Sequence, residues 1–108
     1  MIELPKPVVA YIATSNAHDA RACAACFSDD AVVRDEARVM RGIAAIRDWI
    51  AAAITKYEHT TEVVTSTQKD DETIVTCRLS GTFPGSPIEL RHVFVVVGEK
   101  IVRLEIGL

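Results

Sequence analysis

Residues 27–36 of this chain read FSDDAVVRDE, and residues 42–50 read GIAAIRDWI. Within the first run, side chains from position 31 onward alternate between two faces of a strand, with Ala31, Val33 and Asp35 on one face. Asp35 therefore stands at the end of a short apolar strand, between two segments with helical patterns. A carboxylate in this place can do acid–base chemistry if a second polar group reaches the same cavity.

Helical patterns dominate the first half of the chain. Pro5 and Pro7 suit the start of a first helix, because their missing N–H groups would be unpaired there. We expect Val8, Val9 and Ile12 to form its apolar stripe. Tyr11 then lies on the flank of this helix.

A second, shorter helix is predicted after the first one ends at Asn16. Asp19 is its expected N-cap, and the helix should bury Cys23, Cys26 and Phe27. Residues 28–30 (Ser-Asp-Asp) have the composition of a turn.

The clearest helical pattern follows Gly42. Apolar side chains recur every three or four residues, which is typical of an amphipathic helix. The stripe consists of Ile43, Ile46, Ile50, Ala53, Ile54 and Tyr57, with Trp49 at its edge.

Beyond Tyr57 the period changes to two, which indicates strands. We predict strands over residues 59–68, 73–83, 88–97 and 101–106, with a polar turn at 70–72 and a Pro/Gly turn at 84–87. Helices followed by strands predict an α+β fold, with the helices gathered on one side of an antiparallel sheet.

The predicted strand 88–97 places a histidine in an apolar row. Ile88, Leu90, His92, Phe94 and Val96 share one face of this strand. If that face meets the helices, His92 points into the interior of the protein.

Length and charge narrow the functional classes. The 108 residues suit one domain, residues 1–108. The net charge is −3 and the basic residues are scattered, which argues against nucleic-acid binding. No apolar run is long enough for a membrane span, and the first seven residues lack a signal-peptide pattern.

Three cysteines form no disulfide framework, so we expect a reduced, cytoplasmic location. Cys23 and Cys26 have the spacing of redox or zinc pairs, but their alanine-rich segment and the lack of further ligands favour core packing. The mean hydropathy is slightly positive. Apolar surface hidden in a homodimer would explain this value.

In order and spacing, these residues resemble nuclear-transport-factor-2-like domains of the SnoaL-like and ketosteroid-isomerase-like kind. The resemblance rests on Tyr11, residues 16–19, residues 27–33, Gly42, Ala45-Ile46, Trp49 and the closing Phe94, Lys100-Ile101 and Leu104. It implies a cone, in which a curved antiparallel sheet wraps around the helices and encloses a deep apolar pocket. The fold hosts both enzymes and non-catalytic binders, so function must be argued from the site.

The resemblance also implies site residues. Asp35 occupies the position of the general base of ketosteroid isomerases, and Tyr11 that of a hydrogen-bond donor to the developing enolate. His92 stands nearest the second donor, a protonated aspartate in those enzymes, with Arg91 as the alternative. Because a histidine replaces the aspartate, we expect a proton-transfer site with a specificity other than that of steroid isomerases. The predicted pocket lining comprises Trp49, Tyr57, Phe27, Phe83 and Phe94.

The leading hypothesis is therefore an isomerase, cyclase or dehydratase that moves a proton on a small apolar carbonyl compound. It needs no metal and no cofactor, and the protein is expected to dimerise through its sheet. The alternative is a non-catalytic ligand-binding or protein-interaction module of the same fold, in which Asp35 faces water, Tyr11 is core and His92 is a buried neutral imidazole. His18 and His59 are expected at the surface, and Asp29-Asp30 in a turn rather than a metal site.

Overall fold

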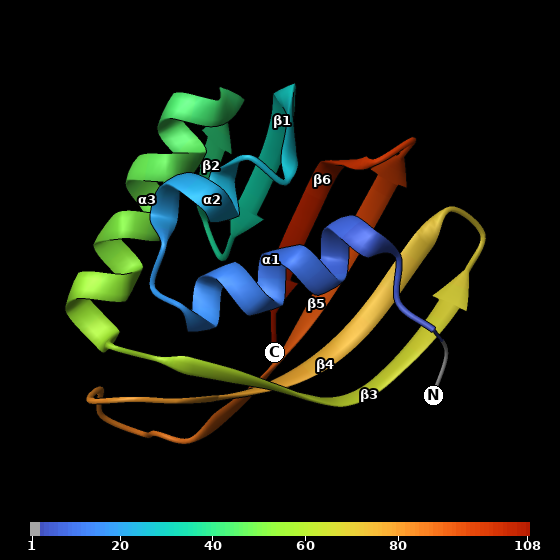
Figure 1. Cartoon of the computed structure of the whole chain (residues 1–108). Coiled ribbons are helices and arrows are strands. Elements are labelled where there is room, and N and C mark those ends of the chain that lie inside the picture. The colour runs from blue at the N-terminus through green and yellow to red at the C-terminus, as the bar shows by residue number, and fades with distance from the viewer. Residues whose placement is uncertain (1–2) are drawn as a thin grey trace.

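The structure, a computed structural model, describes residues 3–108. In this part of the chain, helices α1 (Lys6–Asn16), α2 (Ala20–Ala24) and α3 (Gly42–Tyr57) lie on one side of a curved six-stranded sheet (Figure 1). The strands are β1 (Phe27–Asp35), β2 (Arg38–Arg41), β3 (Thr60–Lys69), β4 (Glu72–Ser80), β5 (Ile88–Val97) and β6 (Lys100–Gly107), in the spatial order β2-β1-β6-β5-β4-β3. The predicted α+β class is confirmed.

One strand pair departs from the antiparallel expectation. β1 runs parallel to β6, whereas the other neighbouring strands are antiparallel, so the sheet is mixed. The pairing of β1 with β6 shifts register between Phe27 and Val32. Residues 28–30 belong to β1 at this irregularity, so the predicted turn there is wrong. Their polar composition marks a bulged stretch of strand instead.

The first two helices pack as short amphipathic segments. α1 buries Val8, Tyr11 and Ser15, which lie three and four residues apart on one helix face. Val9 lies on the opposite face and is 51% exposed, so its predicted place in the stripe is wrong. Asp19 caps α2 as predicted, because its carboxylate accepts a hydrogen bond from the N–H of Ala22 at 3.0 Å.

α3 and β4 also refine the prediction. α3 buries Ile46, Trp49 and Ile50, so Trp49 lies within the buried stripe rather than at its edge. β4 ends at Ser80, and Phe83 lies in the loop that follows instead of in the strand.

The hydrophobic core fills the space between the helices and the concave face of the sheet. Its fully buried side chains come from all layers, and the largest of them are Phe27, Phe94, Ile46, Ile101, Leu104, Val8, Val33 and Val75. This core fixes which face of each strand points inward.

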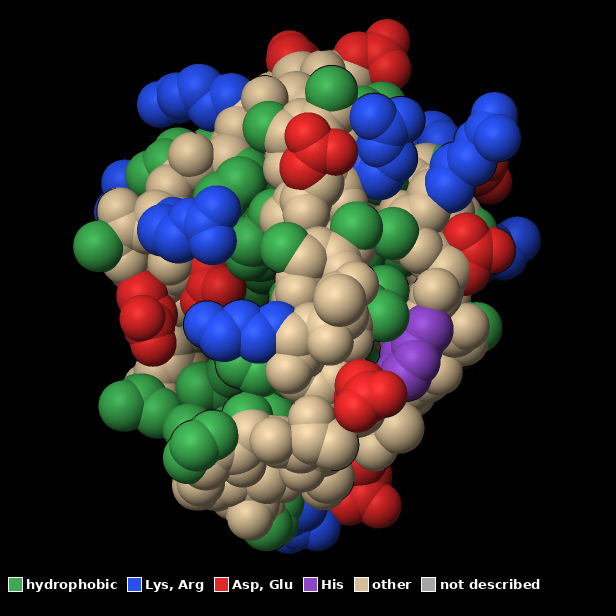
Figure 2. All heavy atoms as spheres, turned by 90° about the vertical axis from the view of Figure 1, so that its left-hand side faces the viewer, with side chains coloured by type: hydrophobic (Ala, Val, Ile, Leu, Met, Phe, Trp, Pro, Cys, Tyr) green, Lys and Arg blue, Asp and Glu red, His purple; other side chains and the backbone are tan. Residues whose placement is uncertain are grey.

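The face of the molecule that carries α3 is mixed in charge (Figure 2). On the side of α3, acidic and basic side chains are interspersed (Figure 2). No helix among residues 3–108 is long and apolar enough to cross a membrane. The prediction about a leader segment includes Met1 and Ile2, which lie outside the described residues.

A close backbone approach ties the end of α3 to the loop after β4. The Tyr57 carbonyl accepts a hydrogen bond from the N–H of Thr82 at 2.9 Å. A Cβ on the neighbouring Gly81 would lie 2.3 Å from that carbonyl oxygen. Only glycine therefore fits here without moving α3 or the loop.

We predict that Gly81→Ala lowers the free energy of unfolding by about 1–3 kcal/mol, because the methyl group forces the backbone apart. Urea unfolding followed by circular dichroism measures this change. The matched control is Gly107→Ala, since a Cβ at Gly107 meets nothing within 4 Å. Equal stability of the two variants would show that the loop moves freely away from α3.

Candidate acid–base site

The sheet register places Asp35 and His92 in one row on the inner face. Ile106 of β6 pairs with Asp35 on one side and with His92 on the other. Adjacent strands are about 4.8 Å apart, so the two polar residues stand about 10 Å apart across the sheet. Both residues stand on the side of the sheet that faces the helices.

Trp49 holds the Asp35 carboxylate from the helix side. Its indole N–H donates a hydrogen bond to Oδ2 of Asp35 at 3.1 Å. Trp49 is 8% exposed and Asp35 is half-buried. The contact orients the carboxylate and leaves its other oxygen free, and a charged acceptor makes such a bond stronger than a neutral one.

Tyr11 enters the same region from α1. Its ring packs edge-on against Phe27 and Phe94, with centroids 5.8 and 5.6 Å apart. Burial raises the pKa of Tyr11 well above its ordinary value, and the nearby thiols of Cys23 and Cys77 and the Asp35 carboxylate add to the rise. The phenol therefore stays protonated at neutral pH. As a neutral hydroxyl group it can donate or accept a hydrogen bond.

His92 points inward, as the alternation of its strand predicts. It is 3% exposed, whereas Arg91 is exposed on the outer face, so the choice between these two residues falls on His92. Its ring stacks on Phe94 at 6.0 Å. Burial lowers the pKa of His92 to about 4, so the imidazole is neutral at pH 7.

The Nδ1 atom of His92 is buried and forms no hydrogen bond with any part of residues 3–108. Buried polar atoms in folded proteins are nearly always hydrogen-bonded. The Leu90 backbone lies close enough to the imidazole to raise its pKa, although by less than burial lowers it.

The predicted aromatic lining separates into two groups. Phe27 and Phe94 are fully buried around Tyr11, and Trp49 contacts Asp35. Tyr57 and Phe83 instead pack edge-on against each other at 5.4 Å, where the end of α3 meets the loop after β4. Their part in a ligand pocket stays a prediction.

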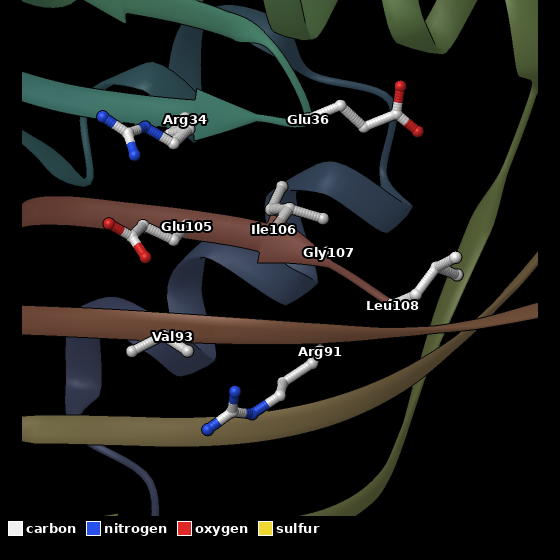
Figure 3. Close-up of a pocket in the computed structure, with 8 residues that line it drawn as sticks. All are labelled: Arg34, Glu36, Arg91, Val93, Glu105, Ile106, Gly107 and Leu108. Carbon is white, nitrogen blue, oxygen red and sulfur yellow. The ribbon is translucent and has the colours of Figure 1, made fainter.

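The surface hollows lie elsewhere. One of about 160 Å³ opens on the outer face of the sheet, among Arg34, Arg91, Val93 and Glu105 (Figure 3). A second, of about 270 Å³, lies beside it at the junction of β1 and β6 and includes Arg41 and Arg103. Neither hollow is lined by Asp35, Tyr11 or His92, so the interior pocket also stays a prediction.

Two polar residues near His92 were not predicted to be buried. His59 is half-buried, contrary to its expected place at the surface, whereas His18 is exposed as predicted. The Ser15 hydroxyl lies 3.5 Å from Nε2 of His59, and burial lowers the pKa of His59. Ser66 has a buried hydroxyl. In the sequence, Ser66 sits in a run of polar strand residues that gives no sign of burial.

The three cysteines lie in the core. In the described part of the chain, no three His, Cys, Asp or Glu side chains gather as metal ligands. The three cysteines are buried and free, as the prediction of core packing requires. Burial raises the pKa of Cys23 to about 12 and that of Cys77 to about 11, so these thiols stay protonated and unreactive.

We predict that His92 makes the fold sensitive to acid. Its folded-state pKa of about 4 lies below the ordinary 6.5, so the unfolded chain binds the proton more tightly. The contribution of neutral His92 to the unfolding free energy is therefore fully present above pH 6.5. It decreases as the pH falls toward 4, by about 3 kcal/mol at most. Urea unfolding from pH 4 to 8 measures it.

The comparison variant is His92→Gln, which removes this titration but leaves those of the carboxylates. The unfolding free energy of the wild type minus that of His92→Gln should decrease as the pH falls from 6.5 to 4. A difference that does not change with pH would mean that His92 is exposed or already paired.

Comparison with known proteins agrees with this architecture. The chain matches the SnoaL-like domain family over residues 8–104. No curated protein matches it at a significant level. A protein of known structure from Sinorhizobium meliloti, provisionally described as a polyketide cyclase, is 36% identical, with 96% of this chain and 95% of that chain covered and a TM-score of 0.91.

Two more distant structures share the fold. A protein with a ketosteroid-isomerase-like fold from Catenulispora acidiphila is 18% identical, with 98% of this chain and 87% of that chain covered and a TM-score of 0.85. An epoxide hydrolase/cyclase-like enzyme of salinomycin formation is 23% identical, with coverage of 93% and 85% and a TM-score of 0.80. On this evidence the chain belongs to the SnoaL-like domain family of nuclear-transport-factor-2-like folds.

Proposed function

We propose that the protein is a cofactor-independent enzyme that moves a proton on a small apolar carbonyl compound, in an isomerisation, cyclisation or dehydration. One observation carries the proposal: Asp35 and His92 stand in the same inner row, with only Ile106 between them. A base and a donor separated by one strand leave room for one reacting group.

Asp35 is the base in this proposal. Its other carboxylate oxygen takes a proton from the carbon next to the substrate carbonyl. The electron pair of the broken C–H bond forms a C=C bond, and the π pair of the carbonyl moves onto its oxygen. Trp49 is a positioning residue, because its bond to Oδ2 fixes the carboxylate.

In isomerisation the protonated Asp35 returns the proton to another carbon. In cyclisation the enolate carbon attacks a second carbonyl, and Asp35 gives the proton to the alkoxide that forms. In dehydration the enolate expels a hydroxyl group from the next carbon, and Asp35 gives it the proton so that it leaves as water.

Tyr11 and His92 stabilise the enolate oxygen. Both are neutral at pH 7, because burial raises the pKa of Tyr11 and lowers the pKa of His92. Each can donate a hydrogen bond through its O–H or N–H group. Donors fixed in a dry site are worth more than donors in water, because they need no reorganisation as charge develops.

The likeness to the Sinorhizobium meliloti protein supports the cyclisation branch, because that relative is described, provisionally, as a polyketide cyclase. The alternative is a binding module that holds an apolar ligand without changing it. A protein-interaction module of the same fold is the other form of this alternative. The close packing of Phe27, Tyr11 and Phe94 favours that form, since it leaves less room for a ligand between α1 and the sheet.

Proton exchange at carbon tests the base directly. We predict that the protein catalyses exchange of the protons next to the carbonyl of 2-acetylnaphthalene or 2-tetralone in deuterated water, followed by proton NMR. Asp35→Asn should abolish catalysed exchange, and Tyr11→Phe should reduce it about 100-fold to 1,000-fold, as loss of one oxyanion donor does in other enzymes.

Asp71→Asn is the matched control, since Asp71 is an exposed aspartate in the turn between β3 and β4. It should exchange at the wild-type rate. Binding of these ketones without exchange would favour the binding module. Exchange that persists in Asp35→Asn would remove Asp35 from the mechanism.

We also propose a homodimer that packs through the outer face of the sheet. Ile74 of β4 pairs with Val93 of β5, and Val95 pairs with Arg103 of β6, so apolar and charged side chains alternate on this face. Ile74, Val93 and Val95 are only half-buried. The three free thiols support a reducing, cytoplasmic location. The continuous hydrophobic core supports a single domain.

Val93→Glu tests the dimer. We predict that the wild type elutes as a dimer at micromolar concentration in size-exclusion chromatography with light scattering. Val93→Glu should elute as a monomer, because burying a larger, charged side chain in the interface costs desolvation. Val9→Glu is the control, since Val9 is exposed on α1. A monomeric wild type, or a dimeric Val93→Glu, would contradict this interface.

A further inference from the structure

The polar row on the inner face does not end at His92. His92 pairs with Val75 of β4, and Val75 pairs with Ser66 of β3. The row therefore reads Asp35, Ile106, His92, Val75, Ser66, with a polar side chain at every second strand. Ser66 stands about 10 Å beyond His92, by the ordinary strand spacing.

The Ser66 hydroxyl is buried and has no hydrogen-bond partner within residues 3–108. Thr65 and Thr67, its neighbours in β3, are exposed, so the inward direction of Ser66 follows from the strand alternation. A hydroxyl left unpaired in the interior destabilises a fold compared with an alanine of nearly the same shape. Packing alone therefore does not explain a serine here.

His92, in the same row, also has a buried polar atom without a hydrogen-bond partner among residues 3–108. Its Nδ1 atom is buried and unpartnered, and it lies between Asp35 and Ser66. α1 contacts β3, and the Ser66 residue as a whole is half-buried. Two buried polar atoms without hydrogen-bond partners in one row of the inner face are suited to the polar groups of a bound molecule.

We propose that Ser66 is a specificity-determining residue, which binds a hydroxyl or carbonyl group at the end of the ligand that lies away from Asp35. The inference rests on the proposed function, because it takes the interior of the cone as the ligand site. It adds that the ligand is an extended apolar compound with two oxygen functions, one for the acid–base residues and one for Ser66.

A site that pairs with a ligand hydroxyl rejects the analogue without it more strongly than an apolar wall could, because the protein group is then left unpaired. Ser66 would thus select among apolar compounds of equal length. Since Ser66 is two strands from His92, it discriminates without touching the carbon that reacts.

The first test needs no ligand. We predict that Ser66→Ala raises the urea midpoint of the unliganded protein, or leaves it unchanged, because the lost hydroxyl has no partner to leave behind. Ser80→Ala is the matched control, an exposed serine at the end of β4. A midpoint that falls in Ser66→Ala but not in Ser80→Ala would overturn the proposal, since the hydroxyl would then have a structural bond or hold only a resident water.

The second test compares 6-hydroxy-2-acetylnaphthalene with 2-acetylnaphthalene by isothermal titration calorimetry. The wild type and Ser80→Ala should bind the hydroxylated ketone about threefold to tenfold more tightly, the range of one net hydrogen bond. Ser66→Ala should bind both ketones with the affinity that the wild type has for 2-acetylnaphthalene.

Equal affinities in the wild type, a preference that survives Ser66→Ala, or no binding of either ketone at millimolar concentration would each overturn the proposal. The outcome is separable from that of the proposed function. The preference is measured as binding of two ketones and tests Ser66, whereas the proposed function is measured as proton exchange and tests Asp35.

Discussion

The pairing of β6 with both β1 and β5 is the constraint on which the site depends. β6 lies between a parallel and an antiparallel neighbour, and Ile106 is the residue that both neighbours share. A shift of one residue in either pairing would turn a whole strand over and send Asp35 or His92 to the outer face. The fully buried Leu104, Phe94 and Val33 oppose such a shift, because their hydrophobic burial would be lost with it.

The interior combines a dense apolar core with a few costly polar groups. Tyr11, His92 and Ser66 point into a region where an unpaired polar atom costs about 1–3 kcal/mol. Asp35 avoids part of this cost through its bond to Trp49. Apolar side chains at these positions would avoid this cost, so the polar row is where the fold departs from what stability alone favours.

Much of the fold could be predicted from local patterns. The alternation in residues 88–97 located His92 on the inner face, and the structure resolves the choice between His92 and Arg91 for that reason. The capping role of Asp19 followed from the side chain alone. The prediction for residues 28–30 was wrong, because a bulged strand and a turn favour the same small polar residues. Only the pairing of β1 with β6 distinguishes the two structures.

By itself, the sequence determined the three helices and the inward faces of β1 and β5, since these follow from periods of 3.6 and two residues. It did not indicate β2. Only the tertiary structure decided that β1 runs parallel to β6, that Trp49 donates to Asp35, and that Ser66 joins the row of His92. These are contacts between distant segments. They depend on register and strand order, which local periodicity does not encode.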